Sequence, residues 1–212
     1  MERIRILVAD DHAIVREGIR RILTDAPEVE VVAEAGDAAE VLRLVRELPL
    51  DIVLLDISFP GKSGLEILAH LKAVKPELPV LMLSMFPEEQ FALRAIKAGA
   101  AGYLTKESAP AELVTAVRDV AAGRRSVSAG TLRQLVDRLN APATSLPHEA
   151  LTTREFSVFL MIAQGRTLTQ IAADLSLSVK TVSTHRRRLL GKLGLRNNVD
   201  LSKYAVQHNL LV

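Results

Sequence analysis

In the first 122 residues, short apolar runs alternate with segments of helical periodicity. The runs are rich in Val, Ile and Leu, which is typical of strands buried on both faces. We expect strands at Ile4–Ala9, Val29–Glu34, Asp51–Leu55, Pro79–Leu83 and Ala101–Leu104. Between and after them we expect helices at Ala13–Thr24, Ala38–Leu48, Gly64–Val74, Glu88–Ala98 and Pro110–Ala122. Five strand–helix units predict an α/β fold with a five-stranded, doubly wound parallel sheet.

Local signals mark several helix ends in this part of the chain. Asp37 and Ser108 stand where an N-cap residue is expected, since their side chains can accept a hydrogen bond from a free backbone N–H. Gly99 and Gly123 follow helical segments, at the position where a left-handed residue commonly ends a helix.

From Leu151 onward the periodicity is helical throughout. We expect a helix from Thr152 or Thr153 to Ala163, and then three more at Thr169–Leu175, Val179–Leu193 and about Asn198–Asn209. Ser176-Leu177-Ser178 is short enough for a tight turn, and Ser178 can cap the third helix. A short helix, a tight turn and a longer helix predict a helix-turn-helix in a small all-α domain.

The residues between these two parts predict a connecting segment. Ser126–Asn140 has the pattern of one more helix, capped near Ser128 or Thr131. Residues 141–148 contain Pro and Ser and have no periodicity, which is typical of a linker. We therefore expect domains at residues 1–125 and 149–212, joined by residues 126–148.

The charge of the chain is divided between these parts. Residues 1–125 carry 16 Lys and Arg against 20 Asp and Glu, whereas residues 126–212 carry 11 against 5. An acidic first part and a basic second part favour two modules, the second with a polyanionic partner. Scatter in surface charge is the simpler alternative.

The composition excludes several classes of protein. There is no cysteine, which rules out disulfides, thiol nucleophiles and cysteine-based zinc sites. No apolar run approaches the roughly 18 residues of a membrane span, and the start of the chain lacks an apolar signal segment. We expect a cytoplasmic protein without a membrane partner.

Polar residues follow four of the expected strands. Asp10 and Asp11 come after the first strand, and Asp56, Ser84 and Lys106 end or follow the third, fourth and fifth. The carboxyl ends of parallel strands share one edge of the sheet, so these side chains should converge there. Adjacent carboxylates suit Mg²⁺, Asp56 can attack a phosphoryl donor, and Lys106 and the metal offset charge on the phosphoryl oxygens.

These residues resemble the receiver domain of two-component response regulators, a flavodoxin-like fold. The match includes Asp56-x₃-Pro60-Gly61-x₂-Gly64 and the run from Ala98 to Lys106, and it spans roughly residues 1–122. The resemblance implies that a sensor histidine kinase phosphorylates Asp56. It implies Mg²⁺ held by Asp11, Asp56 and the backbone carbonyl of Ser58, with Asp10 assisting, and a switch that moves Ser84 and reorients Tyr103. Glu107 stands where many receivers have proline.

The expected helix Val179–Leu193 has an apolar back and a basic front. At 100° per residue, Val182, Leu189 and Leu193 share one face, and Lys180, Thr184 and Arg187 lie opposite, flanked by Ser183 and Arg188. Such a helix suits the major groove of double-stranded DNA. Arg187 is the best candidate for a bidentate contact to guanine, and the Thr184 methyl for a contact to thymine. Lys180, Arg188 and Lys192 are candidates for phosphate contacts. The alternative is a solvated charged face.

The C-terminal part resembles the LuxR-type effector domain of the NarL/FixJ subfamily. The residues that carry this resemblance are Leu151-Thr152-x-Arg154-Glu155, Ile171-Ala172-x-x-Leu175, Ser178-Val179-Lys180-Thr181-Val182-x-Thr184-His185 and Lys192-Leu193-Gly194. The resemblance implies base reading by Ser183, Thr184 and Arg187, with Lys180 and Thr181 near the backbone. It also implies dimerisation through the last helix, for which simple packing within the domain is the alternative.

Together these features predict a DNA-binding transcriptional regulator. Phosphorylation of Asp56 is expected to expose the recognition helix and to favour a homodimer on paired half-sites. Such a receiver is not an enzyme for other substrates and catalyses only its own phosphorylation and dephosphorylation. A DNA-binding regulator that ignores phosphorylation is one alternative, and a small Mg²⁺-dependent aspartyl-phosphate phosphotransferase is another.

Overall fold

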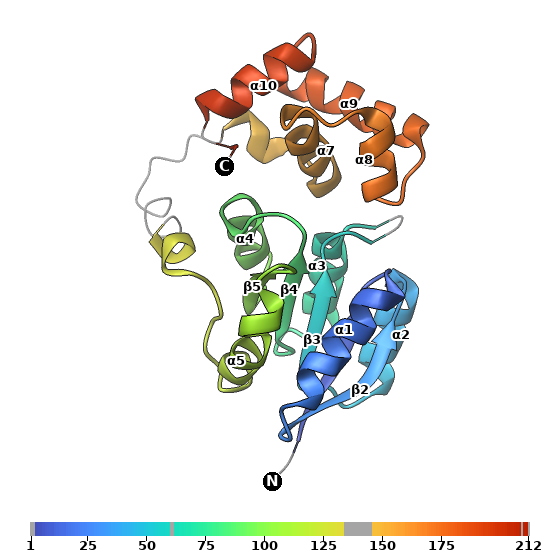
Figure 1. The fold of residues 1–212 in the computed structure, drawn as a ribbon, viewed down its shortest axis with the longest axis vertical. Coiled ribbons are helices and arrows are strands. Elements are labelled where there is room, and N and C mark those ends of the chain that lie inside the picture. The colour runs from blue at the N-terminus through green and yellow to red at the C-terminus, as the bar shows by residue number, and fades with distance from the viewer. Residues whose placement is uncertain (1–2, 60–61, 134–145, 209, 212) are drawn as a thin grey trace. The chain divides into compact units, whose positions relative to one another are not determined.

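The computed structural model describes residues 3–59, 62–133, 146–208 and 210–211 (Figure 1). The chain forms two compact units, residues 1–140 and residues 141–212. The boundary falls inside the expected connecting segment. Each unit has its own core and is described separately below.

The first unit alternates strands and helices. Its strands are β1 (Ile4–Ala9), β2 (Val29–Ala35), β3 (Ile52–Asp56), β4 (Val80–Ser84) and β5 (Gly102–Thr105). Its helices are α1 (Ala13–Thr24), α2 (Ala38–Glu47), α3 (Gly64–Val74), α4 (Glu88–Lys97) and α5 (Ala109–Ala121). All neighbouring strands pair in parallel, in the order β2-β1-β3-β4-β5. The predicted doubly wound sheet is confirmed, with element ends shifted by at most one or two residues.

Helices cover both faces of this sheet (Figure 1). Ile19 and Leu23 of α1 and Leu113 and Val117 of α5 join a buried cluster with Ile6 and its neighbours on one face. Helices α2 and α3 contact each other on the opposite face, and α4 packs beside β5. The central strand β3 is buried along its whole length, and every residue in it before Asp56 is apolar.

The predicted helix ends are largely as expected. The Asp37 side chain accepts a hydrogen bond from Glu40 N at 2.9 Å, and Gly99 and Gly123 have the left-handed φ values of 99° and 75°. The prediction that the Ser108 side chain caps a helix was wrong. Ser108 precedes α5, but its hydroxyl donates back to Thr105 O at 3.3 Å and does not cap the helix.

The start of the connecting segment belongs to the first unit. The expected helix begins at Ala129 rather than Ser126, and Ser128 caps it by accepting a hydrogen bond from Thr131 N at 3.2 Å. Ser126 instead forms a parallel bridge with Gly102. The rest of the expected helix and the linker from residue 141 to 145 lie outside the described residues.

The second unit is all-helical. It begins with a short 3₁₀ turn, η1 (Pro147–Ala150), and continues with α7 (Thr153–Ala163), α8 (Leu168–Asp174), α9 (Val179–Leu193) and α10 (Asn198–Gln207). Thr152, Thr167 and Ser178 cap the first three of these α-helices. Ser176, with φ of 52°, makes the turn between α8 and α9, and Gly194 ends α9 with φ of 67°. The predicted helix-turn-helix is confirmed. No helix in the described parts of the chain is both long and apolar enough to cross a bilayer.

Candidate functional site

Four strand ends bring the predicted acids, hydroxyl and ammonium to one edge of the sheet. Asp56 and Ser84 are the last residues of β3 and β4, and Asp10 and Lys106 follow β1 and β5 directly. The backbone N–H of Lys106 donates to Ser84 O at 2.7 Å, which fixes the lysine beside the neighbouring strand. The convergence expected from the strand order is therefore present.

Lys106 lies between two buried carboxylates. Its Nζ is 2.6 Å from Asp10 Oδ2 and 3.0 Å from Asp56 Oδ2, and both aspartates are almost completely buried. Such contacts hold the three side chains in one arrangement, because breaking either pair would leave a buried carboxylate without its cation.

The balance of charge at this site affects the protonation of Asp56. Burial raises the pKa of Asp56 to about 6; Lys106 and the backbone N–H of Ser58 lower it, and Asp10 raises it further. The pKa of Lys106 is also raised, because its two carboxylates outweigh the effect of burial. One ammonium thus faces two carboxylates, and a compensating positive charge is missing for the second.

Asp11 and His12 extend the cluster toward solvent. His12 Nδ1 is 2.7 Å from Asp11 Oδ1, and the backbone N–H of His12 donates to Asp10 Oδ1 at 2.9 Å. Candidate ligand atoms of Asp10, Asp11 and His12 all lie within 4.8 Å of one another. His12 was not among the predicted site residues, and its place directly after the acid pair was the available signal.

The donor set at this site fits a hard divalent cation. Among the described residues, buried oxygens of Asp10, Asp11 and Asp56 lack a hydrogen bond of good geometry. Three carboxylates face one ammonium, and oxygen ligands are those that Mg²⁺ prefers. This site has the carboxylates to hold such a cation.

The expected hydroxyl–aromatic pair is connected through one residue of the loop after β4. Ser84 Oγ accepts a hydrogen bond from Phe86 N at 3.0 Å, and Tyr103 OH donates to Phe86 O at 2.8 Å. Tyr103 is 1% exposed, so its ring points into the unit. Phe86, which stacks on Phe91 with ring centroids 4.6 Å apart, was not among the predicted site residues. No periodicity or motif marked it.

The loop after β3 approaches the site closely. Gly64 begins α3 beside the Asp56 backbone, and a Cβ on Gly64 would lie 2.0 Å from Asp56 O. Glycine is therefore required here by a close approach of two backbones. Ser58 lies in the same loop, whereas Pro60 and Gly61 are outside the described residues.

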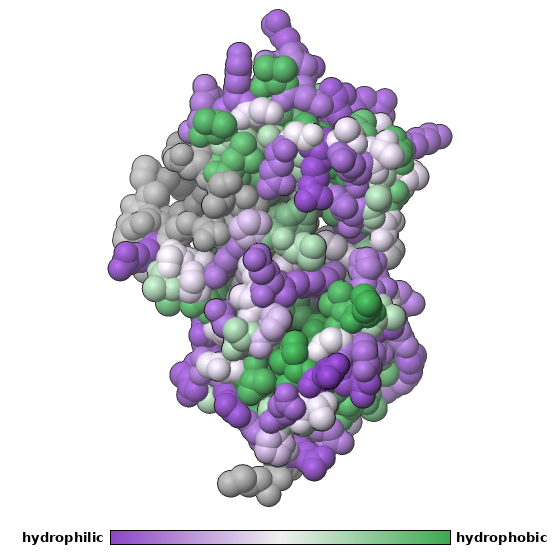
Figure 2. Space-filling model, in the orientation of Figure 1, coloured by the Kyte–Doolittle hydropathy of each residue, from purple (hydrophilic) through white to green (hydrophobic). Residues whose placement is uncertain are grey.

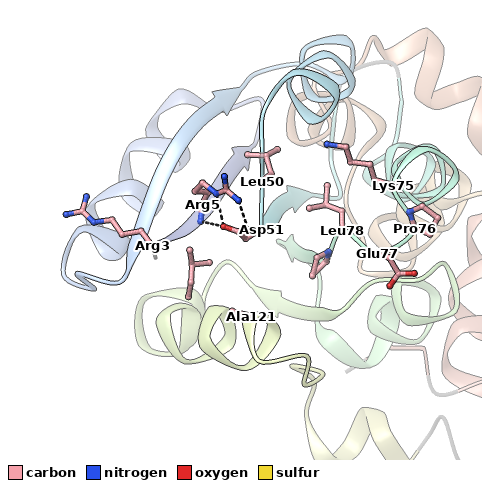
Figure 3. A pocket seen from close by; sticks show the side chains of 11 residues that line it. Arg3, Arg5, Leu50, Asp51, Lys75, Pro76, Glu77, Leu78 and Ala121 are labelled. Carbon is pink, nitrogen blue, oxygen red and sulfur yellow. Dashed lines mark hydrogen bonds and ion pairs between the residues drawn. The ribbon is translucent and has the colours of Figure 1, made fainter. Parts of the chain in front are cut away.

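A separate cavity of about 740 Å³ lies at the opposite, amino-terminal edge of the sheet (Figure 3). On one wall of it, Arg5 pairs with the adjacent Asp51 through two side-chain bonds of 3.1 Å. This pairing lowers the pKa of Asp51 and stabilises the entry to β3. The cavity holds none of the predicted site residues.

In the second unit, α9 has the two faces that its sequence predicted. Val182, Leu189, Leu190 and Leu193 are buried against the domain. The exposed face includes Lys180, Ser183, Arg187 and Arg188, while Thr181 and Thr184 are partly exposed. Hydrophilic residues also cover much of the visible face of this unit (Figure 2). A cationic helix with an apolar back can lie against a polyanion.

Some residues of the predicted DNA-contacting set, Thr184 and Lys192 among them, also make contacts within the domain. The Thr184 hydroxyl donates to Lys180 O at 3.0 Å, which occupies the hydroxyl within the helix. Lys192 Nζ lies 2.6 Å from Glu155 Oε2 and 3.3 Å from Ala150 O. Lys192 therefore links α9 to the start of α7.

A second cation of α9 also has a partner inside the domain. Arg186 Nε donates to Asn198 Oδ1 at 2.7 Å, which connects α9 to the first residue of α10. The position of Arg186 near the apolar edge of the helix left its role open in the sequence. The structure gives it a contact between helices.

Comparison with known proteins matches each unit to a family. Residues 6–118 match the response regulator receiver domain, and residues 149–205 match bacterial regulatory proteins of the luxR family. The chain is 36% identical to response regulator UvrY of Escherichia coli (strain K12), over 98% of this chain and 95% of UvrY. It is 39% identical to response regulator GacA of Pseudomonas aeruginosa, over 98% of each chain.

Solved structures of RcsB share the whole architecture. One contains two RcsB dimers bound to two parallel DNAs, with a TM-score of 0.60, 26% identity and coverage of 97% of this chain and 98% of that one. RcsB from Salmonella enterica serovar Typhimurium, bound to promoter rprA with the phosphomimetic BeF3−, gives a TM-score of 0.62 at 25% identity over 96% and 98%. The chain therefore belongs to the two-component response regulators that join a receiver domain to a LuxR-family DNA-binding domain.

Proposed function

We propose that this protein is a transcriptional regulator whose DNA binding is switched by phosphorylation of Asp56 from a sensor histidine kinase. The observation that carries the proposal is the buried Asp56 carboxylate, held 3.0 Å from Lys106 at a strand end beside two further acids. Membership of the response regulators supports a histidine kinase as the phosphoryl source.

The proposed reaction is a direct phosphoryl transfer. An oxygen of ionised Asp56 attacks phosphorus of a phosphohistidine whose other ring nitrogen carries a proton. The P–N bond breaks with its electron pair left on nitrogen, so the kinase histidine leaves as a neutral imidazole. Lys106 pairs with a phosphoryl oxygen of the product. Asp10, Asp11, Asp56 and the Ser58 carbonyl would hold Mg²⁺, which neutralises charge on the phosphoryl group when bound. Hydrolysis of the acyl phosphate returns free Asp56. In this proposal the site therefore catalyses only the phosphorylation and dephosphorylation of its own chain.

The switch is proposed to run through the loop after β4. Ser84 Oγ now accepts a hydrogen bond from the backbone N–H of Phe86. To donate a hydrogen bond to the phosphoryl group, the Ser84 side chain is proposed to move and to give up this bond. This change alters the Phe86 peptide, to which Tyr103 OH is bonded from the other side. We therefore expect Tyr103 to change its contact when Asp56 is phosphorylated.

The second unit is proposed to bind double-stranded DNA through α9. Ser183, Thr184 and Arg187 are the candidates for base contacts, and Lys180, Thr181, Arg188 and Lys192 for contacts near the backbone. RcsB, a relative with the same architecture, was solved on DNA as dimers and on a promoter with a phosphomimetic. By analogy we propose a homodimer on paired half-sites when the receiver is phosphorylated, acting in the cytoplasm.

Acetyl phosphate with Mg²⁺, followed by intact-mass spectrometry, tests the phosphorylation site. The native chain and Asp25→Asn, an exposed position on the same unit, are expected to gain one phosphoryl group. Asp56→Asn is expected to gain none. Labelling of Asp56→Asn at the native level would reject Asp56 as the acceptor.

Further measurements separate the two alternative functions. Multiple turnover of a small phosphate ester with Mg²⁺ would favour a phosphotransferase. Equal DNA footprints with and without a phosphodonor would favour a regulator that ignores phosphorylation.

A further inference from the structure

A cation of α1 holds the backbone from which the acid pair projects. Arg16 Nη1 donates to the main-chain carbonyl of Asp10 at 2.7 Å, and its Nε donates to Glu34 Oε2 on β2 at 3.1 Å. The Arg16 side chain is 19% exposed, so its bond to Asp10 is partly shielded from water, whereas Glu34 lies at the surface. From the other side, Asp10 N donates to Ala35 O at 3.1 Å. The backbone N–H and the backbone carbonyl of Asp10 are thereby both held by hydrogen bonds.

This arrangement separates the role of Arg16 from that of Lys106. Lys106 contacts the carboxylates themselves, whereas Arg16 contacts the backbone and no carboxylate of the site. Its planar guanidinium bridges two acceptors, which a single ammonium cannot reproduce with the same geometry. Small displacements of a ligand weaken a metal site, so the backbone anchor affects where Asp10 and Asp11 are held.

We propose that Arg16 is a positioning residue that orients Asp10 and Asp11 for a divalent cation, with Glu34 orienting Arg16. The inference rests on the proposed function, since it assigns the acid pair to Mg²⁺. The proposal and simple charge repulsion predict opposite effects of losing Arg16 on the affinity for the cation. Loss of Arg16 should weaken cation binding, even though it removes a positive charge from near the site.

Titration of the full-length chain with MgCl₂, followed through backbone amide shifts by NMR, tests this role. Arg16→Ala is expected to raise the apparent Kd for Mg²⁺ by about tenfold, the lower end of the range for loss of a ligand-orienting contact. Arg20→Ala is the matched control: Arg20 is on the same helix and pairs with Glu17 and Glu34, but makes no bond to Asp10. It should bind Mg²⁺ as the native chain does.

Glu34→Gln and Arg16→Lys complete the set. Both should weaken Mg²⁺ binding, because each leaves only part of the bridge in place. Unchanged or tighter Mg²⁺ binding by a folded Arg16→Ala would overturn the proposal, as would full rescue by lysine. The proposed function fails separately, if the native chain binds no Mg²⁺ or is not phosphorylated on Asp56.

An independent set of contacts ties the start of the connecting segment to the switch elements. Ser126 lies beside β5, where its N–H donates to Ala101 O at 3.1 Å and its carbonyl accepts from Tyr103 N at 2.9 Å. Two residues later, Ser128 N donates to Glu88 Oε1, in the first turn of α4, at 2.7 Å. The segment therefore bonds to the strand that carries Tyr103 and to the helix that follows the Ser84 loop.

Gly102 shows how closely the segment is packed against β5. A Cβ at Gly102 would lie 2.5 Å from Ser126 O and 2.8 Å from a methyl group of Leu81. Ser128 in turn caps the helix that begins at Ala129, and Thr131 in that helix is 2% exposed. The start of the connecting segment is thus anchored to the receiver at Gly102 and at Glu88.

We also infer that the Glu88–Ser128 bond passes the state of the receiver to the connecting segment. This inference deepens the proposed function and depends on it. A change in Tyr103 or in α4 on phosphorylation would alter the anchors of residues 126–131, and hence the chain that leads to the DNA-binding unit. Coupling of this kind is expected to be partial, since the backbone bonds of Ser126 remain.

The ratio of DNA affinities with and without acetyl phosphate, measured on the full chain, tests this coupling. Glu88→Ala is expected to reduce that ratio about two- to tenfold, the range for loss of one hydrogen bond, while Asp56 labelling stays native. Glu88→Gln keeps an oxygen acceptor and should restore most of the ratio. An unchanged ratio in Glu88→Ala would overturn the inference, and equal losses in both variants would assign the effect to charge at the start of α4. Absence of Asp56 labelling in the native chain would instead reject the proposed function.

Discussion

Lys106 is shared by two buried carboxylates, Asp10 and Asp56, and this sharing sets the chemistry of the receiver site. A third acid, Asp11, lies at the rim. Without a further cation, burial leaves Asp56 with a pKa of about 6, so that its ionised, nucleophilic form is destabilised. A divalent cation would favour the ionised form, which links cation binding to the ability of Asp56 to accept a phosphoryl group.

The raised pKa of Asp56 predicts how stability depends on pH in EDTA. The carboxyl titrates near its ordinary 3.8 in the unfolded chain and about 6 in the folded one. Its contribution to stability is therefore full below about pH 3.8 and is lost as pH rises through 6. At about pH 7.5 the ionised group costs up to roughly 3 kcal/mol, a cost that Asp56→Asn avoids.

Urea unfolding followed by circular dichroism measures this cost. Asp56→Asn should be more stable than the native chain at about pH 7.5, and its advantage should shrink by roughly 1–2 kcal/mol at about pH 4.5. An advantage that is the same at both pH values would argue against a raised pKa for Asp56.

A close backbone approach makes a second prediction at this scale. Gly64→Ala would place Cβ 2.0 Å from Asp56 O and 2.8 Å from Ile57 Cα, so it should destabilise the receiver by about 2 kcal/mol or more. Gly18→Ala is the control, because Gly18 lies in α1 with no atom within 4 Å of its would-be Cβ. Alanine there should stabilise by roughly 0.5–1 kcal/mol. Thermal unfolding measures both changes in stability. Equal changes in the two variants would contradict the packing argument.

Which residues meet at the site was predictable because parallel strands bring their carboxyl ends together. Which atoms they bond was not. The pairing of His12 with Asp11 and the link from Ser84 to Tyr103 through Phe86 depend on loop conformation and side-chain rotamers, on which apolar periodicity carries no information. Ser108 is a similar case. Serine is well suited to cap a helix, but the Ser108 hydroxyl donates a hydrogen bond to Thr105 O, three residues earlier, instead.

At the scale of elements, α9 combines two tasks along one helix. Its buried face packs on α7 and α8, and its cations divide between the domain and the solvent. Lys192 bonds to buried Glu155, and Arg186 to Asn198, whereas Arg187 and Arg188 are exposed. Amphipathic spacing predicted the two faces, but could not predict which cations have partners on neighbouring helices.

Lys192→Ala is expected to lower the stability of the DNA-binding unit by about 1 kcal/mol. Burial alone would raise the pKa of Glu155, but its bonds to Lys192 and Thr152 hold that pKa below the ordinary value. Removing Lys192 leaves this carboxylate with fewer partners, although the exposure of Lys192 limits the cost. Thermal unfolding of the full chain checks the effect, with exposed Lys203→Ala as a control that should be neutral.

Arg187→Ala should act on sequence recognition and leave stability unchanged. If Arg187 contacts a guanine, the variant loses about 1–3 kcal/mol on its specific site and little on unrelated DNA. Lys180→Ala should instead weaken binding to both and reduce the salt dependence. Binding sites selected from a random DNA pool provide the specific sequence. Equal losses on all DNA would make Arg187 a phosphate contact.

At the scale of the whole molecule, the acidic receiver and the basic helical unit are two compact bodies on one chain. The charge division and the change from strand–helix alternation to helices alone predicted both. The end of the first body was not predictable, because residues 126–131 look helical in sequence but begin with an extended residue bonded to β5. That bond depends on a tertiary neighbour, 24 residues earlier in the chain at Gly102, which local pattern cannot reveal.

The affinity of the full chain for its selected DNA site, with and without acetyl phosphate at a fixed ionic strength of about 0.15 M, tests the central claim most directly. We predict that phosphorylation of the native chain tightens binding at least about fivefold, a typical size for coupling between two sites. Asp56→Asn should bind with the unphosphorylated affinity under both conditions. Equal affinities of the native chain in both states, with Asp56 shown to be phosphorylated, would contradict the account.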